Sequence, residues 1–158
     1  MEHRRRSLLS CDLVVFIGVA CVMFYDVAAV PCNFAKSKDG IKAECDHRRL
    51  TKFPGDYPAA VTRLDISFNF LTSLVGLADP SFIGLRQLDL SHNSLTSLPD
   101  DAFRDTPHLQ ELSLEGNALC SLSGDVFRGL HNLTQLTLSH TKLTQLSHVT
   151  LSHVTQLT

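Results

Sequence analysis

Residues 109–122, LQELSLEGNALCSL, decide the fold of this 158-residue chain. The same spacing of leucines, with an asparagine after the strand-like centre, occurs before and after this stretch at intervals of 24 residues. A dozen positions in register across several copies exclude a chance match. The shared pair of positions is occupied by Leu64 and Ile66, Leu88 and Leu90, Leu112 and Leu114, and Leu136 and Leu138.

This unit is identified as the leucine-rich repeat in its 24-residue form, with three full copies and one degenerate copy over residues 61–147. Alternating leucines predict a short strand with both leucines facing inward, and stacked units predict a parallel sheet. A coiled coil is excluded because no period of 3.5 residues is sustained. The predicted fold class is therefore an α/β-type repeat solenoid, a leucine-rich repeat horseshoe segment with short parallel strands on its concave face.

An asparagine follows each predicted strand, at Asn69, Asn93 and Asn117. A buried amide at a turn can donate to and accept from backbone groups of its own and the neighbouring turn. We predict a structural ladder of these three side chains. The fourth copy has Thr141 at this position, and a hydroxyl cannot make the same set of bonds.

The first 29 residues predict a secretory signal peptide. Three arginines at 4–6 precede an apolar run from Leu13 to Tyr25, and small side chains, Val27 and Ala29, lie before the predicted cleavage point. The run is shorter than the ~20 residues that span a bilayer. The alternative is an uncleaved signal anchor. In both cases the rest of the chain is exported, so we expect a secreted or extracellular protein, or a cell-surface one if the signal stays or the chain is part of a longer receptor.

Residues 30–60 are predicted to cap the first repeat. Export to an oxidising compartment favours a disulfide, and Cys32 and Cys45 are the obvious pair. We expect a short disulfide-closed loop that covers the apolar end of the stack and leads into the first strand. Closing a loop of about a dozen residues contributes roughly 3 kcal/mol on the chain-entropy estimate.

Residues 32–146 resemble the N-terminal part of a Toll-like receptor ectodomain. The resemblance rests on Cys45-x-x-x-x-Leu50-x-x-x-Pro54, on LDLSHN at 88–93 and on FRGLHNL at 127–133. It implies a solenoid that binds partners and catalyses nothing. Slit-type guidance proteins, Chaoptin-like adhesion proteins and small matrix proteoglycans carry similar units. After residue 146 we find no further repeats, C-terminal cap, membrane span or signalling domain of the receptor type, so we expect a truncated or fragmentary chain that cannot signal alone.

The end of the chain, residues 148–158, is predicted to be a repetitive, uncapped continuation. Short words of Leu, Thr, Ser and His recur there, and the alternation from Val149 to Leu157 predicts more strand. An open strand edge pairs readily with a second chain. We therefore expect dimerisation or aggregation through this end.

Side chains between and after the inward leucines face the concave surface, which is the expected partner-binding face of a solenoid. Phe68 is the single large apolar group there; it either contacts a partner or packs against Phe70 or the cap. Two aspartates, Asp65 and Asp89, occupy one column and are interpreted mainly as a solvated face. The concave-face binding candidates are Arg63, Asp65, Phe68, Gln87, Asp89, His92, Glu111 and Glu115.

Three other features carry open alternatives. Eight histidines invite a metal or acid-sensing interpretation, but His92 and His140 are two units apart, roughly 10 Å, which is too far for easy shared ligation. Cys120 is expected near the surface, either as an inert thiol or as half of an intermolecular disulfide. Asn132-Leu133-Thr134 is an Asn-x-Thr sequon and predicts glycosylation at Asn132.

Composition and motifs limit the function. With 44% apolar and 19% charged residues the chain is not disordered, and a net charge of −2 argues against nucleic-acid binding. No catalytic or metal-binding motif is present, so we expect neither an enzyme, nor a cofactor, nor a metal. The favoured function is an extracellular module that binds a protein or a microbial or glycan ligand in innate recognition. The alternative is a secreted adhesive or matrix protein built from the same repeats.

Overall fold

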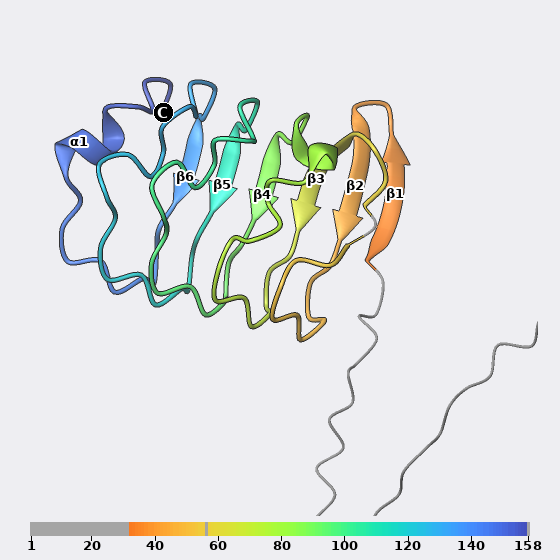
Figure 1. Cartoon of the computed structure of the whole chain (residues 1–158), viewed down its shortest axis with the longest axis horizontal. Coiled ribbons are helices and arrows are strands. Elements are labelled where there is room, and N and C mark those ends of the chain that lie inside the picture. Colours follow the sequence, from red (N-terminus) through yellow and green to blue (C-terminus); the bar gives the residue numbers. More distant parts are fainter. Residues whose placement is uncertain (1–31, 56, 158) are drawn as a thin grey trace, which may run out of the picture.

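The computed structural model describes residues 32–55 and 57–157, so the predicted signal peptide lies outside the described residues. Its central feature is one six-stranded sheet in which the strands follow chain order (Figure 1). The strands are β1 (Asn33–Ser37), β2 (Gly40–Glu44), β3 (Val61–Asp65), β4 (Gln87–Asp89), β5 (Glu111–Ser113) and β6 (Gln135–Thr137).

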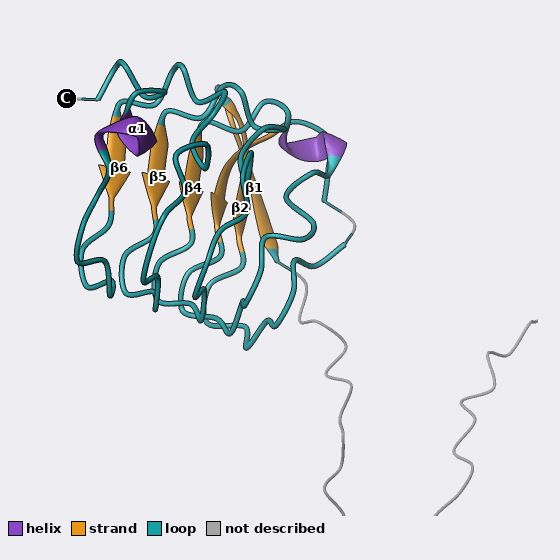
Figure 2. Ribbon diagram, turned by 60° about the vertical axis from the view of Figure 1, so that its left-hand side comes forward, coloured by secondary structure: helices purple, strands orange, loops and turns teal. Residues whose placement is uncertain are grey.

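The parallel strands pair with a constant offset of 24 residues. Leu64 lies opposite Leu88, Leu88 opposite Leu112, and Leu112 opposite Leu136. The other face of each unit is made of turns and loops, as Figure 2 shows, with a 3-10 turn η1 (Pro80–Phe82) and a short helix α1 (His148–Leu151). The predicted solenoid of short parallel strands is confirmed, because each 24-residue unit makes one turn and adds one strand.

The core consists of leucines behind the strands and phenylalanines behind the loops. Phe82, Phe103 and Phe127 are fully buried, and the rings of Phe103 and Phe127 stack with centroids 6.1 Å apart. Phe82 comes three residues late in its unit. The η1 turn accommodates the extra residues, with the Asp79 carboxylate accepting from the Ser81 N–H at its start, and Phe82 then packs on Tyr57 of the cap at 4.5 Å between centroids.

The N-terminal cap is a β-hairpin and not the loop expected from the sequence. β1 and β2 pair antiparallel, and β2 pairs parallel with β3, so the cap adds two strands to the repeat sheet. Ala43 and Cys45 lie at the core positions that Leu64 and Ile66 occupy in the first repeat, and both are fully buried. The predicted disulfide between Cys32 and Cys45 is present. The small core side chains of β2 explain why the leucine pattern did not reveal it.

The predicted strand from Val149 to Leu157 is wrong. Residues 148–151 form α1, which begins at Ser147, whose side chain accepts from the Val149 N–H. This segment repeats the loop geometry of the two preceding units at the same 24-residue offset, with buried Thr150 and Val154 facing the core. The matching backbone bonds are Arg104 N–H to Asp101 O, Arg128 N–H to Asp125 O, and Ser152 N–H to Val149 O.

The alternation in this segment is therefore a property of the words Leu-Ser-His-Val-Thr and not of an extended backbone. Leu151 takes the place of Phe127 and Phe103 in the unit, and Val154 takes that of Leu130. Each unit needs a loop that returns the chain to the next strand position. The fourth unit thus runs on to residue 157, past the boundary at 147 that the sequence predicts.

Candidate functional site

The concave face of the sheet holds a shallow hollow of about 260 Å³ that crosses the parallel strands. Outward-facing side chains of four strands line it, because residues on either side of each inward leucine point away from the core. The side chains expected there from the sequence that do line it are Arg63, Asp65, Gln87, Asp89 and Glu111, and the structure adds Lys42 of the cap and Ser113, Gln135 and Thr137.

Polar contacts order this face. The Gln87 amide donates to the Glu111 carboxylate at 2.8 Å, which joins two neighbouring strands. Lys42 of β2 lies 2.7 Å from the Glu44 carboxylate, and this contact raises the pKa of Lys42. The cations therefore belong to the cap and the first repeat, whereas carboxylates extend further along the sheet.

The two aspartates of the concave column have a structural role as well as a charge. One oxygen of Asp65 accepts from the backbone N–H of Ser67 at 3.1 Å and from its hydroxyl at 2.6 Å. Asp89 accepts in the same way from the Ser91 N–H at 2.9 Å. Each carboxylate thus stabilises the turn that leaves the strand.

Phe68 lies between two imidazole rings. Its ring stacks on His47 of the cap at 4.4 Å between centroids and on His92 of the next repeat at 4.3 Å. All three residues have a positive φ near 50–55°, since they occupy the same position after successive strands. Of the alternatives for Phe68, the structure shows packing on the cap through His47 and adds His92. With both faces of its ring covered, Phe68 is still 47% exposed through the ring edge.

The aromatic column is interrupted at Gly116. This residue has φ +67°, and a Cβ there would lie 2.5 Å from Nδ1 of His92. One strand further, Nε2 of His140 lies 3.8 Å from the Glu115 carboxylate. Gly116 therefore provides the space that the His92 ring occupies.

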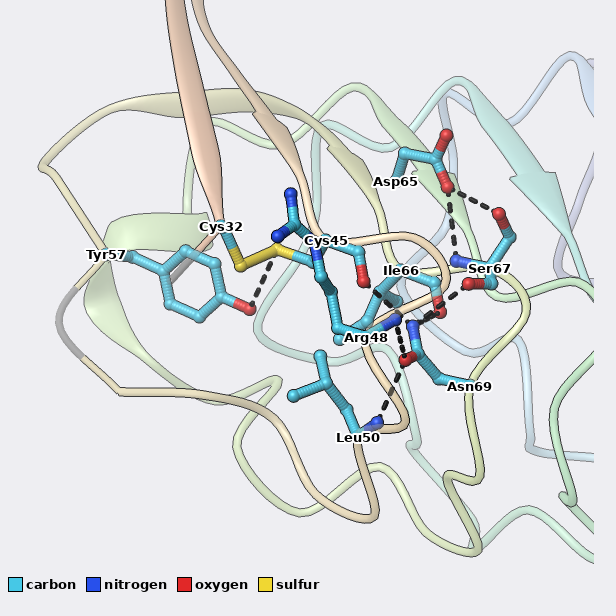
Figure 3. Close-up of a disulfide and its surroundings, with 9 residues drawn as sticks. All are labelled: Cys32, Cys45, Arg48, Leu50, Tyr57, Asp65, Ile66, Ser67 and Asn69. Atoms are coloured by element: carbon cyan, nitrogen blue, oxygen red, sulfur yellow. Dashed lines mark hydrogen bonds between the residues drawn. A yellow bond between two sulfur atoms is a disulfide. The ribbon is translucent and has the colours of Figure 1, made fainter. Parts of the chain in front are cut away.

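The asparagine side chains join each unit to the one before it. Oδ1 of Asn69 accepts from the N–H groups of Arg48 and Leu50, and its Nδ2 donates to the carbonyls of Cys45, Ile66 and Ser67 (Figure 3). Asn93 and Asn117 repeat this arrangement, with Oδ1 accepting from Leu71 N–H and Leu95 N–H. At the equivalent position, the hydroxyl of Thr141 donates to Leu138 O inside its own unit.

The disulfide lies beside the start of this ladder, and Tyr57 covers it (Figure 3). The Tyr57 hydroxyl is 3.9 Å from Sγ of Cys45. Burial raises the pKa of Tyr57, and the charge of Asp79 adds to the rise. The cap is consequently built around a neutral phenol.

Cys120 and Asn132 lie outside the concave face. Cys120 is a free, exposed thiol. Asn132 is exposed, and its Nδ2 donates to Pro107 O at 3.0 Å. Within residues 32–55 and 57–157, no group of three His, Cys, Asp or Glu side chains could hold a metal ion. No helix in that same part of the chain has the length and apolar character of a membrane span.

Sequence reasoning missed Lys42, His47 and Arg86 as parts of this surface. Arg86 shows itself by the 24-residue offset, because it follows Thr62 and precedes Gln110 at one position of the unit. Lys42 and His47 lie 21 residues before Arg63 and Phe68, a different offset, so the repeat period alone could not find them.

Comparisons with known proteins agree with this geometry. The leucine-rich repeat family profile matches residues 59–119 and 107–158. Human Toll-like receptor 8 is 34% identical over 82 residues, which are 51% of this chain and 8% of the receptor. A solved chain of the LRIM1/APL1C complex superposes with a TM-score of 0.55 at 32% identity, over 61% of this chain and 18% of that one. The chain thus spans a small part of these relatives.

Proposed function

Because this chain belongs to the leucine-rich repeat family, we propose that it is an extracellular binding module whose concave face holds a protein partner. The observation that carries the proposal is the open hollow across β3–β6, lined by charged and amide side chains. A rigid sheet presents these groups in fixed columns, which favours recognition of an extended surface. The similarity to Toll-like receptor 8 supports a role in innate recognition.

A glycan placed on one face tests the proposal without disturbing the core. Glu111→Asn creates the sequon Asn-Leu-Ser on the concave face, and Arg104→Asn creates Asn-Asp-Thr on the loop face. Both variants are secreted from animal cells and applied, beside the wild type, to an array of purified secreted and cell-surface proteins. We expect the Glu111→Asn protein to lose the binding that the wild type shows, and the Arg104→Asn protein to keep it. Equal binding by both variants, or an array without a wild-type partner, contradicts the proposal.

Secretion and glycosylation belong to the same proposal. The sequon at Asn132 is exposed on the loop side, away from the concave hollow. A glycan there leaves the proposed binding face free. Peptide-N-glycosidase treatment of the secreted protein checks this, with an expected loss of apparent mass that Asn132→Gln abolishes.

We also propose that two copies associate through the end of the solenoid that carries β6. β6 is the last strand of the described sheet, and Leu146 and Val149 nearby are 41% and 57% exposed. Sedimentation velocity tests this. Val149→Lys should weaken the dimer, whereas Ile83→Lys, which alters an exposed apolar side chain in the first repeat, should not. A monomeric wild type at high concentration contradicts association.

A further inference from the structure

A second hollow, of about 160 Å³, lies at the end of the sheet where β3 and β4 begin, the upper end of these strands in Figure 1. Its lining is entirely polar. It combines side chains that precede the strands, side chains on the strands and one residue of the β1–β2 turn. The lining residues are Asp39, Thr62, Arg63, Arg86, Gln87 and Gln110.

The repeat geometry places two arginines side by side here. Arg86 follows Thr62 at the 24-residue offset, and its N–H donates to Thr62 O at 2.8 Å. The Gln110 N–H donates to Arg86 O at 2.8 Å in the next unit. Arg63 stands one residue after Thr62 on the strand itself, so its guanidinium and that of Arg86 reach the same hollow.

The arginine charges are poorly neutralised. Arg63 has one carboxylate near it, Asp39 at 4.0 Å, and both side chains are about half exposed, at 45% and 48%. In the described part of the chain Arg86 has no acidic side chain within ion-pair distance. Two guanidinium groups and one carboxylate leave one positive charge in excess. The amides of Gln87 and Gln110 add donors at the same place.

We propose that this hollow binds a carboxylate side chain of the protein partner. This inference rests on the proposed function and specifies the chemistry of the partner. A guanidinium group holds a carboxylate through two parallel hydrogen bonds, which also fixes its orientation. The hollow is small and carries a single excess charge, which matches one carboxylate.

The neighbouring concave face determines why the ligand is a protein and not a sulfated glycan. Asp65, Asp89 and Glu111 line the adjoining hollow, so a polyanion that entered the arginine site would meet carboxylates along the rest of the sheet. A protein segment with an acidic residue over the arginines and a basic residue over Asp65 and Asp89 fits both regions. The charge order along the strands therefore sets the direction in which the partner lies.

Selection of displayed peptides provides the test. A library of random 12-residue peptides is selected on the wild-type chain and then measured on an Arg63→Gln/Arg86→Gln variant. Arg104→Gln, which removes a positive charge on the loop face, is the matched control, and thermal unfolding verifies that each variant is folded. We expect peptides enriched in Asp or Glu that bind the double variant at least about tenfold more weakly, because a charge-assisted contact is lost. The Arg104→Gln protein should bind them as the wild type does.

The outcomes separate this inference from the proposed function. Peptides that lose binding in Asp65→Asn/Asp89→Asn but contain no acidic residue, or that keep their affinity for the double arginine variant, overturn the carboxylate site while the concave face remains a binding surface. Binding of a heparin oligosaccharide that disappears in the double arginine variant overturns the protein partner in favour of a glycan. Selected peptides that are unaffected by every concave-face substitution contradict the proposed function itself.

Discussion

The rings of Phe68 and His92 stack with their centroids 4.3 Å apart and their planes 20° from parallel. The two residues are 24 positions apart and hold the same left-handed backbone conformation after neighbouring strands. With His47 on the other side, the contact ties the cap to the first two repeats. Phe68 is therefore a structural element of the surface whose edge remains available to a partner.

Replacing Phe68 with alanine should lower the free energy of unfolding by about 1–2 kcal/mol, because two ring contacts and part of the apolar burial disappear. Phe70→Ala is the control, since Phe70 is more exposed, at 55%, and no ring stacks on it among the described residues. Urea unfolding followed by circular dichroism measures both. Equal losses in the two variants would show that the stack contributes nothing of its own.

Thr141→Asn should raise the free energy of unfolding by about 1 kcal/mol. An amide at this position can accept from the Leu119 N–H and donate to Leu114 O, as Asn117 does with the Leu95 N–H and Leu90 O. Denaturant unfolding gives the difference, and Thr144→Asn, which makes the same chemical change at an exposed site, is the control. A loss of stability in Thr141→Asn would mean that the fourth unit cannot adopt the ladder geometry.

Gly116→Ala should destabilise the protein by about 1–2 kcal/mol. The residue has φ +67°, and the new Cβ would meet the His92 ring at 2.5 Å. Gly84→Ala serves for comparison, because its Cβ would meet no atom within 4 Å and its φ is ordinary. Differential scanning calorimetry reports both changes. If His92→Ala restores part of the loss in a double variant, the ring is the obstacle; if it restores none, the backbone conformation alone causes the loss.

The buried phenol of Tyr57 predicts a loss of stability at alkaline pH. Its pKa is raised in the folded chain, so its contribution is complete below the ordinary value of 10.0 and declines as the pH rises above it. The loss should reach about 1.4 kcal/mol for each pH unit above 10. Tyr57→Phe should reduce this dependence while changing stability at pH 7 very little.

Urea unfolding between pH 8 and pH 11 measures this difference. Both the Tyr57 protein and the Tyr57→Phe variant carry Cys120→Ser, because the free thiolate at Cys120 would otherwise exchange with the disulfide at these pH values. Parallel curves of stability against pH for these two proteins would show that the phenol is not responsible for alkaline unfolding.

The repeat positions show how far sequence reasoning extends. The strand register, the three asparagines, the disulfide and the core phenylalanines follow from a period of 24, because each unit must bury its own leucines against the next. The hairpin cap does not follow from that period. Its strand β2 fills the core with Ala43 and Cys45, and no leucine marks it.

The end of the chain shows the opposite error. Local alternation from Val149 to Leu157 is typical of a strand, but the preceding units impose a loop and a helical turn there. Thr150 and Val154 face the core because the stack determines which side is buried. A short polar segment has little intrinsic preference, so its neighbours decide its conformation.

The amino-acid sequence by itself determined that this chain is a stack of 24-residue leucine-rich repeats with a cysteine-closed start, since burial of leucines at a fixed period admits no other arrangement. Only the tertiary structure decided which polar side chains meet. Arg63 and Arg86 belong to neighbouring units, and Phe68 lies between rings from the cap and from the second repeat. Such contacts run across the strands, perpendicular to the chain, where the distance between side chains depends on how the units stack.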